Sequence, residues 1–224
     1  GAWGRQGARA AGWGLGSSAR GVRVGEGLAR GHPWPGGGGD GLACYRWRLD
    51  KGHGPEKSAI GGDAAGGGLT MATLLAARDE GLPMPGAAIL ISPWTDLTCD
   101  TGSYRSKADA EPMITPQSIR ETAATYLAGA AASDPLASPN LADLTGMPPM
   151  LIHVGSDEVL LDDSRDLEKR AVAADVDAEI EIWDGMIHVW HAFYQMLPEG
   201  EQAIERMGSY LSAKWNSAEK IPVI

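Results

Sequence analysis

The chain has 224 residues, 43% hydrophobic and 21% charged, with a formal net charge of −10 at pH 7. This length fits a single domain over residues 1–224 with a sizeable core, or one domain carrying an insertion. The acidic balance argues against nucleic acid as a partner and against anionic membranes, because both are bound through basic residues.

Cysteine usage and hydropathy favour a cytoplasmic protein. The two cysteines, Cys44 and Cys99, provide neither a disulfide framework nor a metal-ligand cluster, so we expect no metal and no cofactor. No apolar run is long enough to cross a membrane, and the N-terminus lacks the apolar centre of a signal peptide.

Residues 1–40 are crowded with Gly and Arg and follow neither helical nor strand periodicity, which is typical of low-complexity sequence. The four glycines at 36–39 are not followed by Lys-Ser/Thr and not preceded by an apolar strand. A phosphate-binding loop is therefore not predicted there.

From residue 42 onward, helical periodicity alternates with short apolar runs. Helices are expected over 42–50, 69–79, 118–127, 163–174 and a last segment through 204–215. Strands are expected at 58–60, 87–94, 149–155 and, as an outer strand with one wet face, 177–183. This alternation predicts an α/β fold with a mostly parallel central sheet and helices on both faces. The polar stretch 97–148 is too long for a connection and is expected to be an inserted cap or lid.

A small-residue turn follows the first expected strand, with the sequence Gly62-Asp63-Ala64-Ala65-Gly66. Such a turn reverses a strand sharply into a helix, exposes the apex side chain and directs backbone N–H groups outward. It matches the nucleophile elbow G-x-S-x-G at both glycines but has Ala64 where the serine belongs. The alternative is a Rossmann loop, which is disfavoured because the G-x-G-x-x-G spacing is absent and Asp63 would face a pyrophosphate.

The stretch GDAAGGGL resembles the GDSAGGGL of the hormone-sensitive-lipase-like esterases, the bacterial family IV carboxylesterases. Further blocks in the same order and spacing extend the resemblance over most of residues 32–215: HPWP, LACYRWRLDKG, ISPWTDLT, DPLASPNLADLTGMPPMLIHVGSDEVLLDDS and WDGMIHVWHAF. The resemblance implies an α/β-hydrolase fold with a cap. It also implies Ser-His-Asp hydrolysis of small or short-acyl esters, or of lactones.

Carried over residue by residue, the resemblance places the nucleophile at Ala64, the acid at Asp157 and the general base at His188. Without it, Asp157 is one acidic residue among several, and His191 is a rival to His188. His153 lies between apolar neighbours in an expected strand, which favours a packed core histidine.

The resemblance also implies an oxyanion hole, with one donor from the backbone N–H of Ala65 and others from an upstream HGGG motif. No HGGG occurs in this chain, so we expect it to be truncated at its N-terminus. The segment GEGLARGHP also departs from the family's DYRLAPEHP. With Ala64 at the apex, the chain is expected to have almost no esterase activity. The alternative function is a catalytically dead relative that binds a small apolar ligand.

The outer strand 177–183 is the expected contact of a homodimer, because family relatives often pair through this edge. The alternative is a monomer in which the acidic Glu179 and Glu181 protect the edge from pairing.

Overall fold

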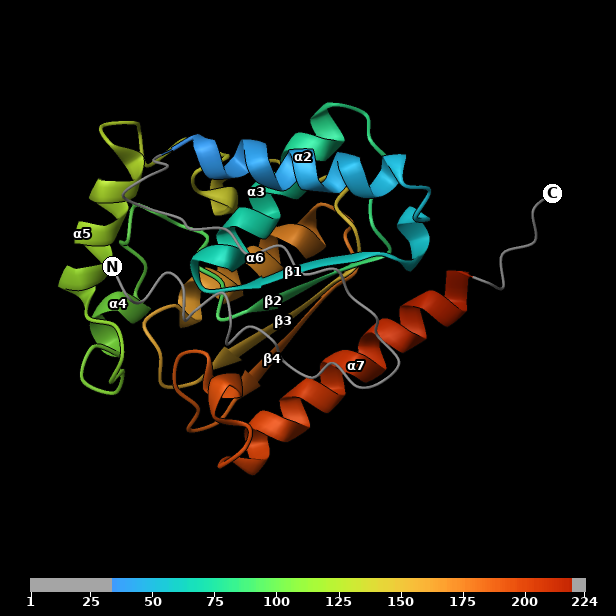
Figure 1. Ribbon diagram of the computed structural model, residues 1–224. Coiled ribbons are helices and arrows are strands. Elements are labelled where there is room, and N and C mark those ends of the chain that lie inside the picture. Colours follow the sequence, from blue (N-terminus) through green and yellow to red (C-terminus); the bar gives the residue numbers. More distant parts are fainter. Residues whose placement is uncertain (1–33, 219–224) are drawn as a thin grey trace.

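The computed structural model describes residues 34–218, and its centre is a sheet of four parallel strands (Figure 1). The strands are β1 (Ala59–Asp63), β2 (Ala87–Ile91), β3 (Met150–Gly155) and β4 (Ala178–Trp183), in that spatial order. Register brings Asp63 beside Ile91, Ile91 beside His153, and Gly155 beside Trp183. Because all four strands are parallel, the segments that follow them leave from one edge of the sheet.

Helices cover both faces of this sheet, as the sequence predicts. Figure 1 shows α2 (Gly36–Asp50), α3 (Ala65–Asp79) and α6 (Leu161–Ala173) on one face, and α7 (Pro198–Ala218) on the other. Strands β2 and β3 are buried along their whole length, which explains their continuous apolar runs. Helix α7 buries an apolar stripe, including Ile204, Met207 and Leu211, against residues of β2 and β3.

Two helices begin earlier than periodicity predicts. Helix α2 begins at Gly36 rather than at 42, and α3 begins at Ala65 rather than at 69. Both early turns are rich in glycine, which forms helices poorly, so local propensity could not indicate them. Tertiary packing supplies the stability: a Cβ on Gly41 of α2 would collide with the side chain of Thr73 on α3. Gly41 therefore allows the two helices to approach closely.

The stretch 97–148 contains α4 (Ser103–Ser106), α5 (Pro116–Leu127) and the 3₁₀ turn η2 (Pro139–Leu141). Helix α5 begins at a capping box between Thr115 and Ser118. The first part of the stretch packs around Trp94, whereas its last part, through Leu144 and Met147, joins the main core beside the sheet. That 97–148 acts as a cap stays a prediction.

In Figure 1, α4 and α5 lie at the end of the sheet toward which the strand arrows point. Two short 3₁₀ turns, η1 (Pro55–Lys57) and η3 (Trp190–Phe193), complete the described elements. None of the helices between residues 34 and 218 has the length and apolar character needed to span a membrane.

Candidate active site

Ala64 joins β1 to α3 in a strained backbone conformation, with φ of 50° and ψ of −119°. A positive φ is uncommon for a residue other than glycine and persists only where the surroundings enforce it. Two backbone hydrogen bonds do so here. The N–H of Ala64 donates to the carbonyl of Ile91 at 3.0 Å, and its own carbonyl accepts from the N–H of Trp94 at 2.9 Å. Both bonds hold the apex against the end of β2.

The glycines on either side of Ala64 are required by close packing. A Cβ on Gly62 would collide with the backbone of Gly66, and one on Gly67 would lie 2.6 Å from Cβ of Pro93. The turn is therefore as tight as the sequence pattern predicts, and it places Ala65 in the first turn of α3. A backbone N–H at a helix N-terminus has no acceptor within the helix and can bind a developing negative charge.

A buried histidine and a buried carboxylate meet at the same edge of the sheet. His188 lies in the segment after β4, and its Nδ1 is 2.9 Å from Oε2 of Glu158, which follows β3. His188 is 5% exposed and Glu158 is fully buried. The other carboxylate oxygen, Oε1, accepts from the N–H of Gly155 at 2.5 Å and from the hydroxyl of Ser92 at 2.9 Å. These contacts fix the carboxylate, which in turn orients the imidazole.

The acid expected from the sequence, Asp157, does not make this contact. Its carboxylate lies 3.4 Å from Nζ of Lys107, and its side chain is 39% exposed. The chain turns directly after Gly155, so that the side chains of Asp157 and Glu158 diverge, and of these two carboxylates only Glu158 is buried. In the structure, His188 thus contacts Glu158 rather than Asp157, and which of the two carboxylates is the catalytic acid stays a prediction. An acidic run that also contains Asp162 carries no sequence signal for which member turns inward.

Ser92 is a site residue that sequence reasoning missed. It follows β2 with a φ of 44° and is fully buried. Its hydroxyl donates to Glu158 and accepts from the N–H of Val189 at 3.1 Å, so one side chain joins the acid to the histidine segment. The signal in the sequence was its place directly after a buried strand, in the block ISPW.

The apex of the elbow lies beside the histidine segment. Ala64 packs against a core cluster that includes Ile91 of β2 and Val189, the residue after His188. Val189 itself has a positive φ of 49°, so strained backbone occurs at Ala64, Ser92 and Val189, each in a segment that follows a strand. These are three of the six non-glycine residues with a positive φ among the described residues, and the others are Cys99, Ala128 and Asp175.

The rival histidine, His191, belongs to a different cluster. Its Nε2 is 3.1 Å from Nδ1 of His153, and both imidazoles are fully buried near Trp183 and Trp190. Burial, reinforced by neighbouring His153, lowers the pKa of His191 to about 3. His153 is the packed core histidine that the sequence predicts. His188, rather than His191, therefore holds the carboxylate contact expected of a general base.

A second carboxylate lies near this pair. A carboxylate oxygen of Glu111, a carboxylate oxygen of Glu158 and a ring nitrogen of His188 lie within 4.8 Å of one another, and all three residues are buried. The short contact between His188 and Glu158 accounts for two of these atoms, so the group is best understood as an acid–base cluster.

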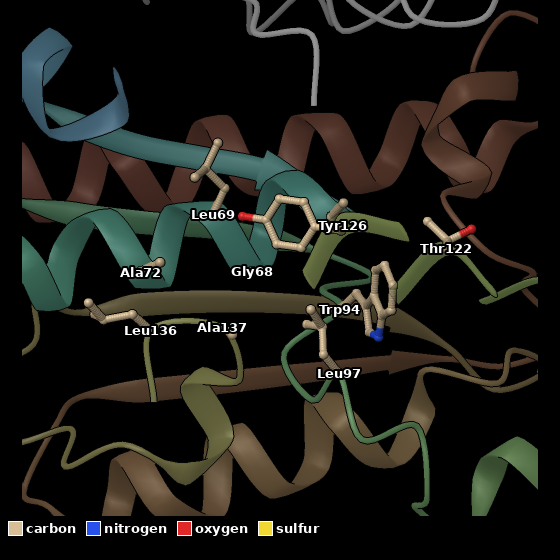
Figure 2. Close-up of a pocket in the computed structure, with 10 residues that line it drawn as sticks. Gly68, Leu69, Ala72, Trp94, Leu97, Thr122, Tyr126, Leu136 and Ala137 are labelled. Carbon is tan, nitrogen blue, oxygen red and sulfur yellow. The ribbon is translucent and has the colours of Figure 1, made fainter. Parts of the chain in front are cut away.

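An apolar pocket begins at the first turn of α3, and its open space, including the mouth, amounts to about 600 Å³. Figure 2 shows Leu69 and Ala72 of α3, the aromatic rings of Tyr126 and Trp94, and Leu136 at this pocket. Its remaining lining residues are Ala65, Gly68, Leu97, Thr122 and Ala137. A largely apolar lining beside the elbow suits a small hydrophobic group.

Comparison with known proteins gives a consistent result. The family described as having the alpha/beta hydrolase fold matches residues 18–192. An acetyl-hydrolase of Streptomyces hygroscopicus is 46% identical over 179 residues, covering 80% of this chain and 60% of that protein. A putative acetyl-hydrolase of Mycobacterium tuberculosis is 34% identical over 180 residues, covering 80% of this chain and 58% of that protein.

Solved structures agree. An esterase/lipase from an uncultured bacterium is 56% identical, with a TM-score of 0.82 over 84% of this chain and 64% of its own. An esterase from the bacterial hormone-sensitive lipase family is 46% identical, with a TM-score of 0.83 over 84% of this chain and 63% of its own. The chain thus spans about three fifths of the length of these relatives.

Proposed function

The chain belongs to the α/β-hydrolase fold family, as a relative of the hormone-sensitive-lipase-like esterases, and we propose that its site is built to hydrolyse small or short-acyl carboxylic esters. One observation carries the proposal: a strained elbow at Ala64 stands at the same sheet edge as the buried contact between His188 and Glu158. In this proposal residue 64 lacks the nucleophilic oxygen, the chain also lacks the HGGG motif expected to supply oxyanion donors, and the chain as it stands is inactive.

The mechanism requires a serine at the apex. His188 accepts the hydroxyl proton as the oxygen attacks the ester carbonyl, and Glu158 stabilises the imidazolium that forms. The N–H of Ala65 donates to the developing oxyanion. The imidazolium then protonates the leaving alcohol, and water, activated by the same histidine, releases the acid from the acyl-serine. Without the serine oxygen there is nothing for His188 to activate, and loss of a triad nucleophile can cost on the order of 10⁶-fold in rate.

The substrate class follows from the pocket beside the elbow. Its lining is apolar apart from Thr122 and the hydroxyl of Tyr126, so the pocket suits a short acyl chain better than a charged one. The solved structures include one of EstE5, a 56% identical relative, soaked with p-nitrophenyl butyrate. We therefore propose short acyl esters such as butyrates, and small lactones with them.

Covalent labelling of the active site tests this proposal, because the probe reacts with an activated serine and requires no complete catalytic turnover. The Ala64→Ser variant, treated with a fluorophosphonate probe near pH 8, should gain a covalent adduct on the introduced serine, located by peptide mass spectrometry. The unaltered chain should stay unlabelled. A double variant that adds His188→Asn should lose the label. A folded Ala64→Ser protein that remains unlabelled, or labelling that survives without His188, would contradict the proposal.

A second candidate function is favoured by Ala64 itself: a binding protein that holds a small apolar ligand without cleaving it. The pocket beside Ala65 does not depend on the missing oxygen. Titration calorimetry of the unaltered chain with ethyl butyrate distinguishes the two candidates. Saturable binding, together with an Ala64→Ser variant that neither labels nor turns over, would favour the binding function.

We also propose that two copies pair through residues 177–183. Strand β4 is the outer strand of the described sheet, and Ile182 on it is 42% exposed. Arg206 of α7 pairs with Glu179 and Glu181, which offsets part of the negative charge that would otherwise oppose pairing. Light scattering should give the mass of a dimer, and Ile182→Asp should reduce it to that of a monomer. A monomer at high concentration of the unaltered chain would refute this contact.

A further inference from the structure

Glu111 is a buried carboxylate that the proposed mechanism does not use. It lies between α4 and α5 and is 5% exposed. Its Oε1 accepts from the N–H of Met113 at 2.8 Å, whereas Oε2 is buried without a hydrogen-bond partner among the described residues. Burying a carboxylate oxygen without a donor is unfavourable, so either a proton on the carboxyl or a nearby positive charge has to compensate for it.

The imidazole of His188 lies close enough to Glu111 to supply a positive charge when it is protonated. An oxygen of Glu111, an oxygen of Glu158 and a ring nitrogen of His188 lie within 4.8 Å of one another. The three residues come from separate segments: the chain between α4 and α5, the turn after β3 and the segment after β4. The imidazole therefore lies close to two carboxylates.

A further ion pair involves residues close to these in the chain: Nζ of Lys107 lies 3.4 Å from the carboxylate of Asp157, and there the two charges offset each other. Burial raises the pKa of Glu111 and so does neighbouring Glu158, whereas the backbone N–H of Met113 and a charged His188 lower it. The charge of Glu111 is thus coupled to the protonation of His188.

We propose that Glu111 is a second carboxylate of the acid–base site, a positioning residue whose charge stabilises the protonated form of His188. This inference rests on the proposed function, since it concerns the same histidine. Stabilising the imidazolium strengthens the general base, because that cation forms whenever the serine gives up its proton. Glu111 belongs to the stretch 97–148, so the proposal also couples that stretch to the base.

Titration of the His188 imidazole by NMR tests the proposal in the chain as it exists, without any need for esterase activity. Replacing a carboxylate near a cation by a neutral amide makes protonation less favourable, so Glu111→Gln should lower the titration midpoint of His188 by about one pH unit. Asp157→Asn is the matched control, and its carboxylate is held by Lys107, so the midpoint should change by less than about 0.3 unit. Glu111→Asp keeps the negative charge, so the titration midpoint of His188 in this variant should stay close to that of the unaltered chain.

An unchanged His188 midpoint in a folded Glu111→Gln protein would overturn the proposal. Should that variant fail to fold, the ¹³C resonance of the Glu111 carboxyl in the unaltered chain decides the question. It should show a step at the His188 midpoint, and absence of that step would also overturn the proposal. These outcomes are separate from the labelling of Ala64→Ser, so the inference and the proposed function can fail independently.

Discussion

The hydroxyl of Ser92 lies 2.9 Å from Oε1 of Glu158 and joins the end of β2 to the acid that follows β3. The hydroxyl oxygen of Ser92 also accepts from the N–H of Val189, next to His188. Ser92 thus fixes the relative position of the two residues proposed to activate the nucleophile.

Ser92→Ala should therefore weaken both stability and catalysis. Loss of a buried hydroxyl that bonds a carboxylate should lower the free energy of unfolding by about 1–3 kcal/mol. In an Ala64→Ser background it should also lower kcat about 10-fold, because Glu158 and His188 lose their common anchor. Chemical denaturation and ester kinetics measure the two effects. Ser212→Ala, at an exposed position on α7, is the control and should change stability by less than about 0.5 kcal/mol. Equal effects of the two variants would contradict the role of Ser92.

The choice between Glu158 and Asp157 is directly testable in an Ala64→Ser background. Glu158→Gln should reduce kcat about 10³–10⁴-fold, because an amide neither orients the imidazole correctly nor stabilises its cation. Asp157→Asn should change kcat by less than about threefold, since this half-exposed carboxylate contacts Lys107 instead. Steady-state kinetics on a butyrate ester compares them. A larger loss for Asp157→Asn would restore the original sequence-based assignment.

The tightness of the elbow predicts different outcomes for two neighbouring glycines. Gly67→Ala should lower the free energy of unfolding by about 1–3 kcal/mol, because its Cβ would overlap Pro93. Gly66→Ala is the control: its Cβ meets open space, and alanine is the better helix former, so stability should stay equal or rise by up to about 1 kcal/mol. Urea denaturation of both variants tests this. Equal losses would mean that the packing of α3 against Pro93 is looser than described.

Burial of His191 predicts acid sensitivity. Its pKa is lowered to about 3 from an ordinary 6.5. Below pH 6.5, His191 therefore becomes protonated in the unfolded chain but stays neutral in the folded chain. Stability is consequently lost as the pH falls from 6.5 toward 3, by at most about 1.4 kcal/mol per pH unit. Glu181, with a pKa lowered to about 2 by His153 and Arg206, adds its own loss only below about pH 4.5.

The difference in the pH dependence of the free energy of unfolding between the unaltered chain and His191→Gln, over pH 6.5 to 4.5, gives the contribution of His191. Burial raises the pKa of Asp163 and of Glu111, and these groups contribute to both proteins. His191→Gln should flatten the slope in this window even if it lowers the overall stability. His53→Gln, at an exposed position, should leave the slope unchanged. A slope that stays the same in both variants would show that His191 takes up its proton in the folded state as readily as in the unfolded one.

Much of the fold could be predicted because its signals are local. The apolar runs of β2 and β3 indicate strands buried on both faces, and the spacing of small residues around Ala64 indicates a sharp strand-to-helix turn. The fold class, the parallel sheet and the turn are accordingly confirmed. The start of α2 at Gly36 was missed because it depends on packing against α3 rather than on propensity.

The site could be predicted only in part because its geometry depends on contacts between distant segments. His188 and the elbow residues are identifiable from their blocks. The inward turn of Glu158 instead of Asp157 depends on a change of direction after Gly155 that has no pattern in the sequence. Ser92 contacts Glu158, which is 66 positions away in the chain, and Glu111 lies near Glu158, which is 47 positions away. Neither could therefore be predicted from the local sequence.

The most direct test of the central claim is the release of p-nitrophenol from p-nitrophenyl butyrate at pH 8 by the unaltered chain and by Ala64→Ser. The unaltered chain should give no more than the buffer rate, since it lacks the nucleophilic oxygen. Ala64→Ser should hydrolyse the ester above that rate, with activity that rises as His188 loses its proton and that disappears on adding His188→Asn. Robust hydrolysis by the unaltered chain, or a folded Ala64→Ser protein no faster than buffer, would contradict the account.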